Sequence, residues 1–525
     1  MKKGLLALMV LFVFLLAAAS ARAQTIDQKI KALEQELLQL KEQQIEMKKE
    51  ATEAAAAMPS FSYRPGNGLN IEAADKSWGF RTSIESHFRM NFQSGRDEVG
   101  RTNGEVMGRR FRPEFYYCIN NCLWEIEARL DLDGYGTGNA KNSTNTGGNS
   151  ILQRGVLNID LAQINPWFPR VQLGMEVSTA QGGSLARQGS GSVGAQAEYD
   201  LHTRNNGFNT GRAGNGIVFN WDNKPLASIG VPGRIGRFQL AMANIAEGDD
   251  GLSSFTDRKD FNAYLSLMPF SQVKNKWLSG FTFEFGTWFC NNDGRGQTTS
   301  GSGSTVVGTA LVTGSNVRVP GASNGCDRYR IQDHGDGGRQ TLYDTGSGSI
   351  GQGLHTAMGP GIVWAVGPYT LRAMGHFQQS EDHGGTTGKK RANSFLIGHD
   401  LFLWSPKGFL TGSSSTPGSI LFGTHFERVN MSCDDGAGNT RCAGFNGGEF
   451  ARIRVLLREW DLWYFIAPRM SIGTSILWYD ASNLRTGRFS TGQNLGIHRV
   501  GCPTAECRGK GGDWVDVMLN WRYTF

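Results

Sequence analysis

The sequence predicts an all-β fold: a transmembrane antiparallel β-barrel of about 16 strands, preceded by a short coiled-coil helix. Three observations predict it: an N-terminal export segment, many short stretches with strict apolar–polar alternation, and connections that are alternately short and long. After the export segment, no stretch approaches the ~18 unbroken apolar residues of a membrane helix. A closed barrel is the other structure that satisfies its own backbone hydrogen bonds inside a bilayer.

The first 23 residues have the pattern of a secretory signal peptide. Lys2 and Lys3 precede an apolar run from Leu5 to Leu16, and the small-residue cleavage site Ala21-Arg22-Ala23 follows. We therefore expect residues 1–23 to be removed, so that the mature chain starts at Gln24.

Residues 24–57 predict a periplasmic coiled-coil helix, because apolar residues recur with a seven-residue repeat. Most of the remaining positions are Lys, Glu or Gln, which suits a self-associating helix with a charged exterior; a lone solvated amphipathic helix is the alternative. A coiled coil with this small number of heptads is only marginally stable by itself. We therefore expect the barrel to help hold the oligomer together. Residues 58–77 are expected to be a linker and residues 78–525 the barrel domain. The repeat positions are Ile26, Leu33, Leu40 and Met47, with Ile30, Leu37 and Gln44 between them.

Composition agrees with a barrel and argues against a nucleic-acid partner. The 525 residues include 71 glycines and only 39% hydrophobic residues, which are spread over short runs rather than gathered into cores. The formal net charge of +6 falls to about +3 without Lys2, Lys3 and Arg22, too small to indicate nucleic acid or a strongly charged partner.

The first and last predicted strands have the clearest alternation. From Trp78 to Phe92, and again from Asp513 to Phe525, apolar residues take every second position. A chain that ends on such a strand, with a terminal aromatic residue, resembles the closing strand of an outer-membrane barrel; an edge strand of a soluble sandwich is the alternative. The same pattern predicts further strands near 110–117, 124–133, 152–163, 169–177, 216–222, 234–244, 259–268, 278–289, 354–366, 368–378, 393–404, 418–429, 448–466 and 468–480.

Connections after the second, fourth, tenth and fourteenth strands are short, whereas the alternate ones are long. Short periplasmic turns opposite long outer loops are typical of membrane barrels. The long loop 290–353 contains a stretch, Thr305–Val319, that is expected to form an extra hairpin outside the membrane.

The eight cysteines of an exported chain predict disulfides, and spacing favours pairing of sequence neighbours across one turn or loop. No cysteine or histidine spacing resembles a zinc cage or a haem attachment site, so no metal or cofactor is expected. The candidates are Cys118, Cys122, Cys290, Cys326, Cys433, Cys442, Cys502 and Cys507.

Four short motifs are similar to those of outer-membrane porins of the phosphate-selective porin O/P type. They are Gly68-Leu-Asn-Ile-Glu72 with Phe80-Arg81, Arg109-Arg110-Phe111-Arg112, Arg170-Val-Gln-Leu-Gly-Met175, and Trp463-Tyr464 through Tyr479-Asp480. The resemblance covers most of 66–525. It implies a homotrimeric porin in the outer membrane of a Gram-negative bacterium, with a periplasmic N-terminus and passive diffusion of small hydrophilic solutes or ions.

Strand parity predicts an arginine-rich inner wall where the last strand closes on the first. We expect this wall, and the inward-folded third outer loop (178–215) that the porin resemblance implies, to give weak anion preference; ordinary lumen charges paired across strands are the alternative. Few lysines line the predicted interior, which argues against phosphate specificity. The expected wall comprises Arg81, Arg89, Arg110, Arg112, Arg452, Arg454 and Arg522, and the loop candidates are Arg187, Glu198, Asp200, Arg204 and Arg212.

Other functions are less well supported. No group of nucleophile, base and orienting residue emerges, so no enzyme is expected. The alternative non-enzymatic function is a barrel scaffold that sheathes a partner protein, such as a multihaem cytochrome in an outer-membrane electron conduit.

Overall fold

The computed structural model divides into two compact units, residues 1–60 with 72–77 and residues 61–71 with 78–525, which are considered separately. The residues that the structure describes are 29–49, 58–64, 68–94, 103–130, 132, 152–175, 216–226, 230–243, 260–292, 304–307, 310–313, 330–332, 341–344, 353–380, 389–406, 416–434, 451–467, 470–482 and 512–524.

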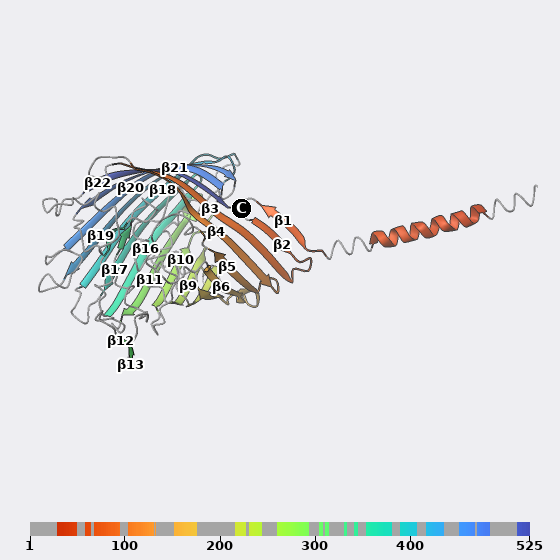
Figure 1. The fold of residues 1–525 in the computed structure, drawn as a ribbon, viewed down its shortest axis with the longest axis horizontal. Coiled ribbons are helices and arrows are strands. Elements are labelled where there is room, and N and C mark those ends of the chain that lie inside the picture. Colours follow the sequence, from red (N-terminus) through yellow and green to blue (C-terminus); the bar gives the residue numbers. More distant parts are fainter. Residues whose placement is uncertain are drawn as a thin grey trace, which may run out of the picture. The chain divides into compact units, whose positions relative to one another are not determined.

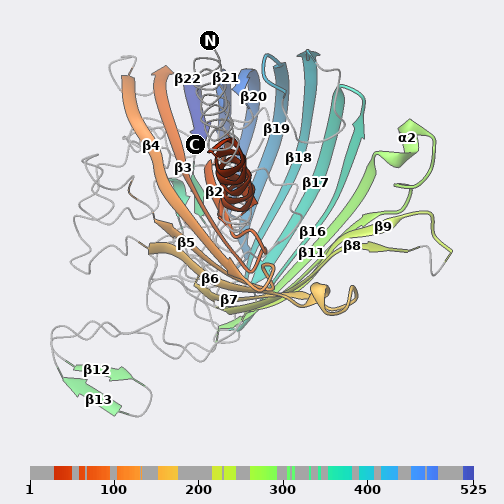
Figure 2. The same ribbon diagram turned by 90° about the vertical axis from the view of Figure 1, so that its right-hand side faces the viewer.

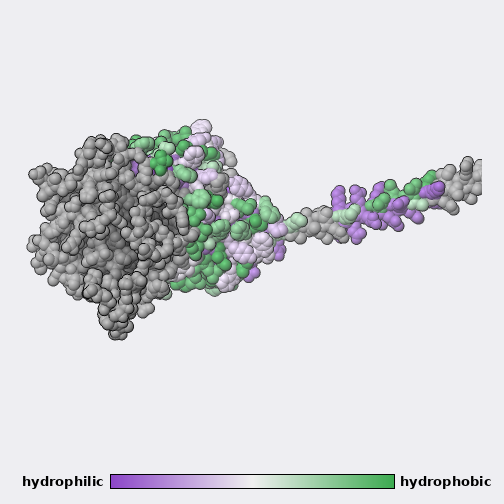
Figure 3. All heavy atoms as spheres, viewed as in Figure 1, coloured by the Kyte–Doolittle hydropathy of each residue, from purple (hydrophilic) through white to green (hydrophobic). Residues whose placement is uncertain are grey.

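The first unit contains one described helix, at residues 29–49, within the predicted coiled coil. Its heptad residues are exposed: Leu33 to 63%, Leu40 to 58% and Met47 to 62%. Figure 3 shows an apolar stripe beside the polar side chains of this helix. Among the described residues, no helix is long and apolar enough to cross a membrane.

The second unit is a closed antiparallel barrel of 16 strands, which confirms the predicted fold class. All predicted strand regions form strands, and Figures 1 and 2 show them side by side around the wall. The barrel strands are β3 (Trp78–Ser94), β4 (Asn103–Ile119), β5 (Trp124–Leu130), β6 (Leu152–Asp160), β7 (Arg170–Met175), β8 (Gly216–Pro225), β9 (Arg234–Ala243), β10 (Asp260–Met268), β11 (Phe281–Asn292), β16 (Gly353–Val366), β17 (Tyr369–Ser380), β18 (Lys389–Trp404), β19 (Ile420–Asp434), β20 (Ala451–Ala467), β21 (Met470–Ser482) and β22 (Gly512–Thr524).

The barrel closes between β22 and β3, as the sequence predicts. The register pairs Val515 with Ser94 at one end and Thr524 with Glu85 at the other. Because β22 stops opposite Glu85, the first residues of β3 extend beyond their neighbour.

Two short strands in the expected linker cover this extension. β1 (Ser60–Arg64) pairs with β2 (Gly68–Glu72), and β2 pairs with β3. Gly68 has φ +77°, and a Cβ there would lie 1.9 Å from the carbonyl oxygen of Thr82, so only glycine allows this approach. The segment 58–77 is therefore a docked hairpin over part of its length rather than a plain linker.

The connections alternate in length as predicted. At one end of the barrel they are short, such as 367–368 between β16 and β17, and at the other end they are long, such as 293–352 between β11 and β16. The short-turn end also holds a 3-10 turn (Leu161–Gln163) and the single-turn helix α2 (Lys276–Ser279). The longest loop contains the hairpins β12 (Ser304–Val307) with β13 (Ala310–Thr313) and β14 (Arg330–Gln332) with β15 (Thr341–Asp344), so the predicted extra hairpin is present.

The outward face of the barrel is apolar, as a lipid-facing wall requires. Phe88, Met90 and Phe92 alternate along β3 with buried polar residues, and the same pattern continues around the wall. Figure 3 shows apolar side chains gathered on the outside of the barrel. Near the short-turn end, exposed aromatic residues form a girdle of the kind found at a membrane interface: Tyr117, Trp124, Trp277, Trp404, Tyr464 and Trp521.

Candidate functional site

The inward face of the barrel is mainly polar, and its polar side chains contact one another where β22 meets β3. Alternation turns His87, Arg89 and Asn91 of β3 inward, and each is nearly fully buried. On β22 the inward residues include Asn520 and Arg522, which are 1% and 5% exposed. The closing register brings these two sets into contact, because Asn520 pairs with Arg89 and Arg522 with His87.

We call His87, Arg89, Trp463, Asn520 and Arg522 the seam wall. Arg89 Nε donates a hydrogen bond to Asn520 Oδ1 at 2.9 Å, and His87 Nε2 lies 3.2 Å from the same oxygen. The guanidinium carbon of Arg522 stands 3.9 Å from the centre of the Trp463 ring, in cation–π contact.

A glycine makes room for this arrangement. Gly473 of β21 is paired with Trp463 on one side and with Asn520 on the other. A Cβ at Gly473 would lie 2.4 Å from the Trp463 ring, so the missing side chain lets the indole lie across β21 towards β22. The contact between Trp463 and Arg522 therefore depends on Gly473.

The seam wall carries two guanidinium groups and lies beside the buried carboxylates of Glu459 and Asp461. Guanidinium groups remain charged at every physiological pH, and the Asn520 and Trp463 contacts orient two of them with neutral partners. Asp461 of β20 accepts a hydrogen bond from Ser475 and interacts electrostatically with Arg522. Within the described part of the chain, Asn520 Nδ2 meets no acceptor, so the wall also holds a neutral donor.

Arginines elsewhere on the inner face form ion pairs with carboxylates across neighbouring strands. Arg154 Nε lies 2.8 Å from Glu127, and Arg237 Nε lies 2.8 Å from Asp222. Such pairs cancel charge at short range. The other described pairs are Arg129–Glu114, Arg170–Asp160 and Arg372–Asp400.

Two further arginines of the predicted wall line the inner face of β3 and β4. Arg81 is exposed, with its guanidinium carbon 4.0 Å from the centre of the Tyr116 ring. Arg112 is buried, and its backbone pairs with that of Glu85. The side chains of Arg110 and Arg452 lie outside the described residues. So do all five loop candidates, Arg187, Glu198, Asp200, Arg204 and Arg212.

The structure corrects the prediction for Arg454. It alternates in phase with Trp460, Leu462 and Tyr464, which are exposed on the outer face, whereas Glu459 and Asp461 are the buried inward residues. The prediction failed because β20 is apolar on both faces: Trp463 and Phe465 are buried inside with Leu421. Alternation alone therefore could not identify the inward set.

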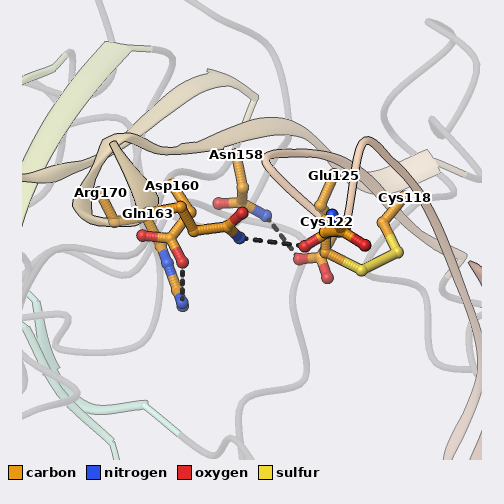
Figure 4. The surroundings of a disulfide bond; sticks show 8 residues. Cys118, Cys122, Glu125, Asn158, Asp160, Gln163 and Arg170 are labelled. Carbon is orange, nitrogen blue, oxygen red and sulfur yellow. Dashed lines mark hydrogen bonds and ion pairs between the residues drawn. A yellow bond between two sulfur atoms is a disulfide. The ribbon is translucent and has the colours of Figure 1, made fainter. Parts of the chain in front are cut away.

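One predicted cysteine pair is present in the described residues. Cys118 and Cys122 form a disulfide across the turn between β4 and β5 (Figure 4). This turn holds Asn120, Asn121 and Cys122 at positive φ, a conformation that asparagine tolerates better than most residues. Gln163 Nε2 donates to the Asn121 carbonyl at 3.1 Å. The side chains of the other six cysteines lie outside the described part.

Three members of the seam wall were absent from the predicted site: His87, Asn520 and Trp463. His87 and Asn520 were recognisable as polar positions of alternating strands, and the expected closure of the barrel places them opposite Arg522 and Arg89. Trp463 gave no such signal, because a tryptophan in a barrel strand is expected from the sequence to face the lipid.

The chain's sequence matches no protein-family model and no curated protein. The fold is similar to that of a number of solved structures, three of which follow. OmpT, an outer membrane protein of Vibrio cholerae, is 8% identical with a TM-score of 0.45, over 86% of this chain and 98% of that one. The anion-selective porin from Comamonas acidovorans is 11% identical (TM-score 0.46, 85% and 100%), and the outer membrane channel DcaP of Acinetobacter baumannii is 9% identical (TM-score 0.42, 85% and 97%). Values this low carry no conclusion about the function of this chain, and the resemblance to the phosphate-selective type stays a prediction.

Proposed function

We propose that this chain forms a water-filled channel in the outer membrane of a Gram-negative bacterium, for passive diffusion of small hydrophilic solutes with a preference for anions. The observation that carries the proposal is the division of one barrel wall into an apolar outer face and a polar inner face. A wall of this kind separates lipid from an aqueous interior.

The anion preference rests on the seam wall. Fixed charges that line a pore select ions by sign. Arg89 and Arg522 contact an amide and an indole, and these contacts hold the two guanidinium groups on the inner face. Asp461 offsets part of that charge, so the preference is weak rather than absolute.

We further propose that the functional unit is a homotrimer held partly by the N-terminal helices. The apolar heptad residues of helix 29–49 are all exposed in one chain, as self-association requires. Replacing Leu33 and Leu40 with lysine is expected to reduce the particle mass in detergent, measured by light scattering; the surface change Lys31→Glu, Lys41→Glu is the control.

Single-channel recording tests the channel itself. Full-length protein in a planar bilayer is expected to give discrete conductance steps that are open at low voltage. A barrel that never conducts, and that purifies with a visible haem band, would instead support the alternative of a sheath around a cytochrome.

A further inference from the structure

Four arginines stand on the outer face of the barrel, where lipid contact would be expected. They are Arg391 of β18, Arg428 of β19, and Arg454 and Arg458 of β20, and we call them the outer patch. Arg391, Arg428 and Arg458 are exposed and Arg454 is half-buried. Each alternates with a buried inward neighbour, so their outward orientation follows from the strand itself.

The strand register assembles the patch from three adjacent strands. Asn430 lies opposite Arg454, and Arg428 lies opposite Leu456 on β20. Arg391 and Arg454 are near the ends of their strands at the long-loop end of the barrel, whereas Arg458 is closer to the middle of β20. Arg391 lies opposite Ser432, which lies opposite Arg452, so the patch spans the levels of positions 452 to 458. With ~3.4 Å per residue and ~4.8 Å between strands, it covers about 20 Å along the strands and about 10 Å across.

From the outer patch towards the short-turn end of β20, the same outer face becomes apolar. Trp460, Leu462, Tyr464 and Ile466 follow Arg458 at every second position along β20 and are all exposed. The face therefore joins a basic region at the long-loop side to an apolar region at the short-turn side, which matches a lipid with an anionic headgroup above its acyl chains.

At two other described places near the long-loop end, the outward residues are apolar. Near the long-loop end on β10 and β11, the paired outward residues are Phe261 and Phe289, and both are exposed. On β3 and β22 the corresponding pair is Phe92 with Val517. A general requirement for basic residues at the membrane boundary would have placed arginines there as well.

Local contacts orient the guanidinium groups. The Arg458 guanidinium carbon lies 4.4 Å from the centre of the Trp478 ring, and Arg428 Nε donates to Asn430 Oδ1 at 3.1 Å. Arg454 Nε is buried and meets no hydrogen-bond partner within the described residues. The described outward acid beside them is Asp480 of β21, half-buried and paired with Leu456, so positive charge dominates the patch.

We propose that the outer patch binds the headgroup of an anionic glycolipid that carries two or more phosphates, in the leaflet at the long-loop side. Guanidinium groups bind phosphate through paired charged hydrogen bonds. Arginine is costly near the bilayer midplane and well tolerated near the headgroups. The acyl chains would lie on the apolar residues that follow Arg458.

Lipid binding to the purified full-length protein tests this. Delipidated protein in mixed micelles is titrated with diphosphoryl lipid A, and bound lipid is counted by native mass spectrometry. The variant Arg454→Gln, Arg458→Gln is expected to bind about tenfold more weakly, a change equal to about 1.4 kcal/mol. The matched control Arg170→Gln, Arg237→Gln removes two exposed arginines from the inner face and is expected to bind like the unchanged protein.

Three results would overturn the proposal. The first is equal weakening in both double variants, which would indicate a general charge effect. The second is displacement of lipid A by inorganic phosphate at an equal phosphate concentration, which would indicate an ion site. The third is unchanged lipid binding with a smaller particle mass in the patch variant, which would indicate a subunit interface. The shift in gel mobility on heating verifies that each variant is folded. If the double variant does not fold, the single exposed change Arg428→Gln replaces it in the test and is expected to weaken binding by a smaller factor.

Discussion

The seam wall and the ion-paired arginines on the rest of the inner face use the same residue in two ways. In the pair Arg372–Asp400, both side chains are nearly buried and opposite charges meet directly. In the seam wall, Arg89 binds the oxygen of an amide and Arg522 lies on an indole ring. The first arrangement places opposite charges in direct contact, and the second adds contacts from an amide and an indole that orient the guanidinium groups.

We therefore propose that selectivity depends on how the inward charges are held as well as on their number. Arg129, Arg154 and Arg372 add three positive charges to the inner face, and each has a carboxylate beside it. A passing ion senses the uncancelled part of the field. Asn520 and Trp463 set where the guanidinium groups of Arg89 and Arg522 lie on the inner face.

The largest expected effect comes from breaking a buried pair. Arg372→Ala leaves the Asp400 carboxylate in the wall without its cation, and we expect the free energy of unfolding to fall by about 3 kcal/mol. Urea unfolding in vesicles, followed by tryptophan fluorescence, measures this. The double variant Arg372→Ala, Asp400→Asn should recover part of the loss; if it is less stable than the single variant, the pair does not act as described.

A smaller effect is expected from the neutral contact at the seam. Asn520→Ala removes the acceptor of Arg89 Nε, and we expect a loss of about 1.5 kcal/mol in the same unfolding assay. Asn520→Asp keeps an acceptor at that place and is the control. Equal losses in the two variants would show that the hydrogen bond to Arg89 contributes little.

The smallest effect is expected at an exposed pair. In Arg237–Asp222 the two side chains are 47% and 34% exposed, so solvent screens their attraction. Asp222→Asn should change the unfolding free energy by less than about 1 kcal/mol. A loss as large as that of Arg372→Ala would mean that burial does not distinguish the two pairs.

Much of the fold was predictable because lipid and water lie on opposite faces of one wall. Where only the outer face is apolar, as on β3 and β22, alternation identified the strand and its inward side. On β20 it identified the strand but not the side, because Trp463 and Phe465 make the inner face apolar as well. This is the physical reason why Arg454 was assigned to the pore.

The remaining gaps concern contacts that alternation cannot encode. The hairpin of β1 and β2 consists of five-residue strands, too short for a clear period, and its docking depends on Gly68. The seam wall depends in the same way on Gly473, which permits the contact between Trp463 and Arg522. A glycine in the sequence does not show which neighbouring residue will occupy the space that its missing side chain leaves.

The reversal potential of single channels in a salt gradient tests the central claim most directly. The reversal potential of the unchanged protein should have the sign that indicates anion selectivity. The double variant Arg89→Gln, Arg522→Gln should move the reversal potential towards zero. The control Arg170→Gln, Arg237→Gln removes the same charge from ion-paired positions and should move it less. A reversal potential of the sign that indicates cation selectivity in the unchanged protein, or an equal shift in both double variants, would contradict the assignment of selectivity to the seam wall.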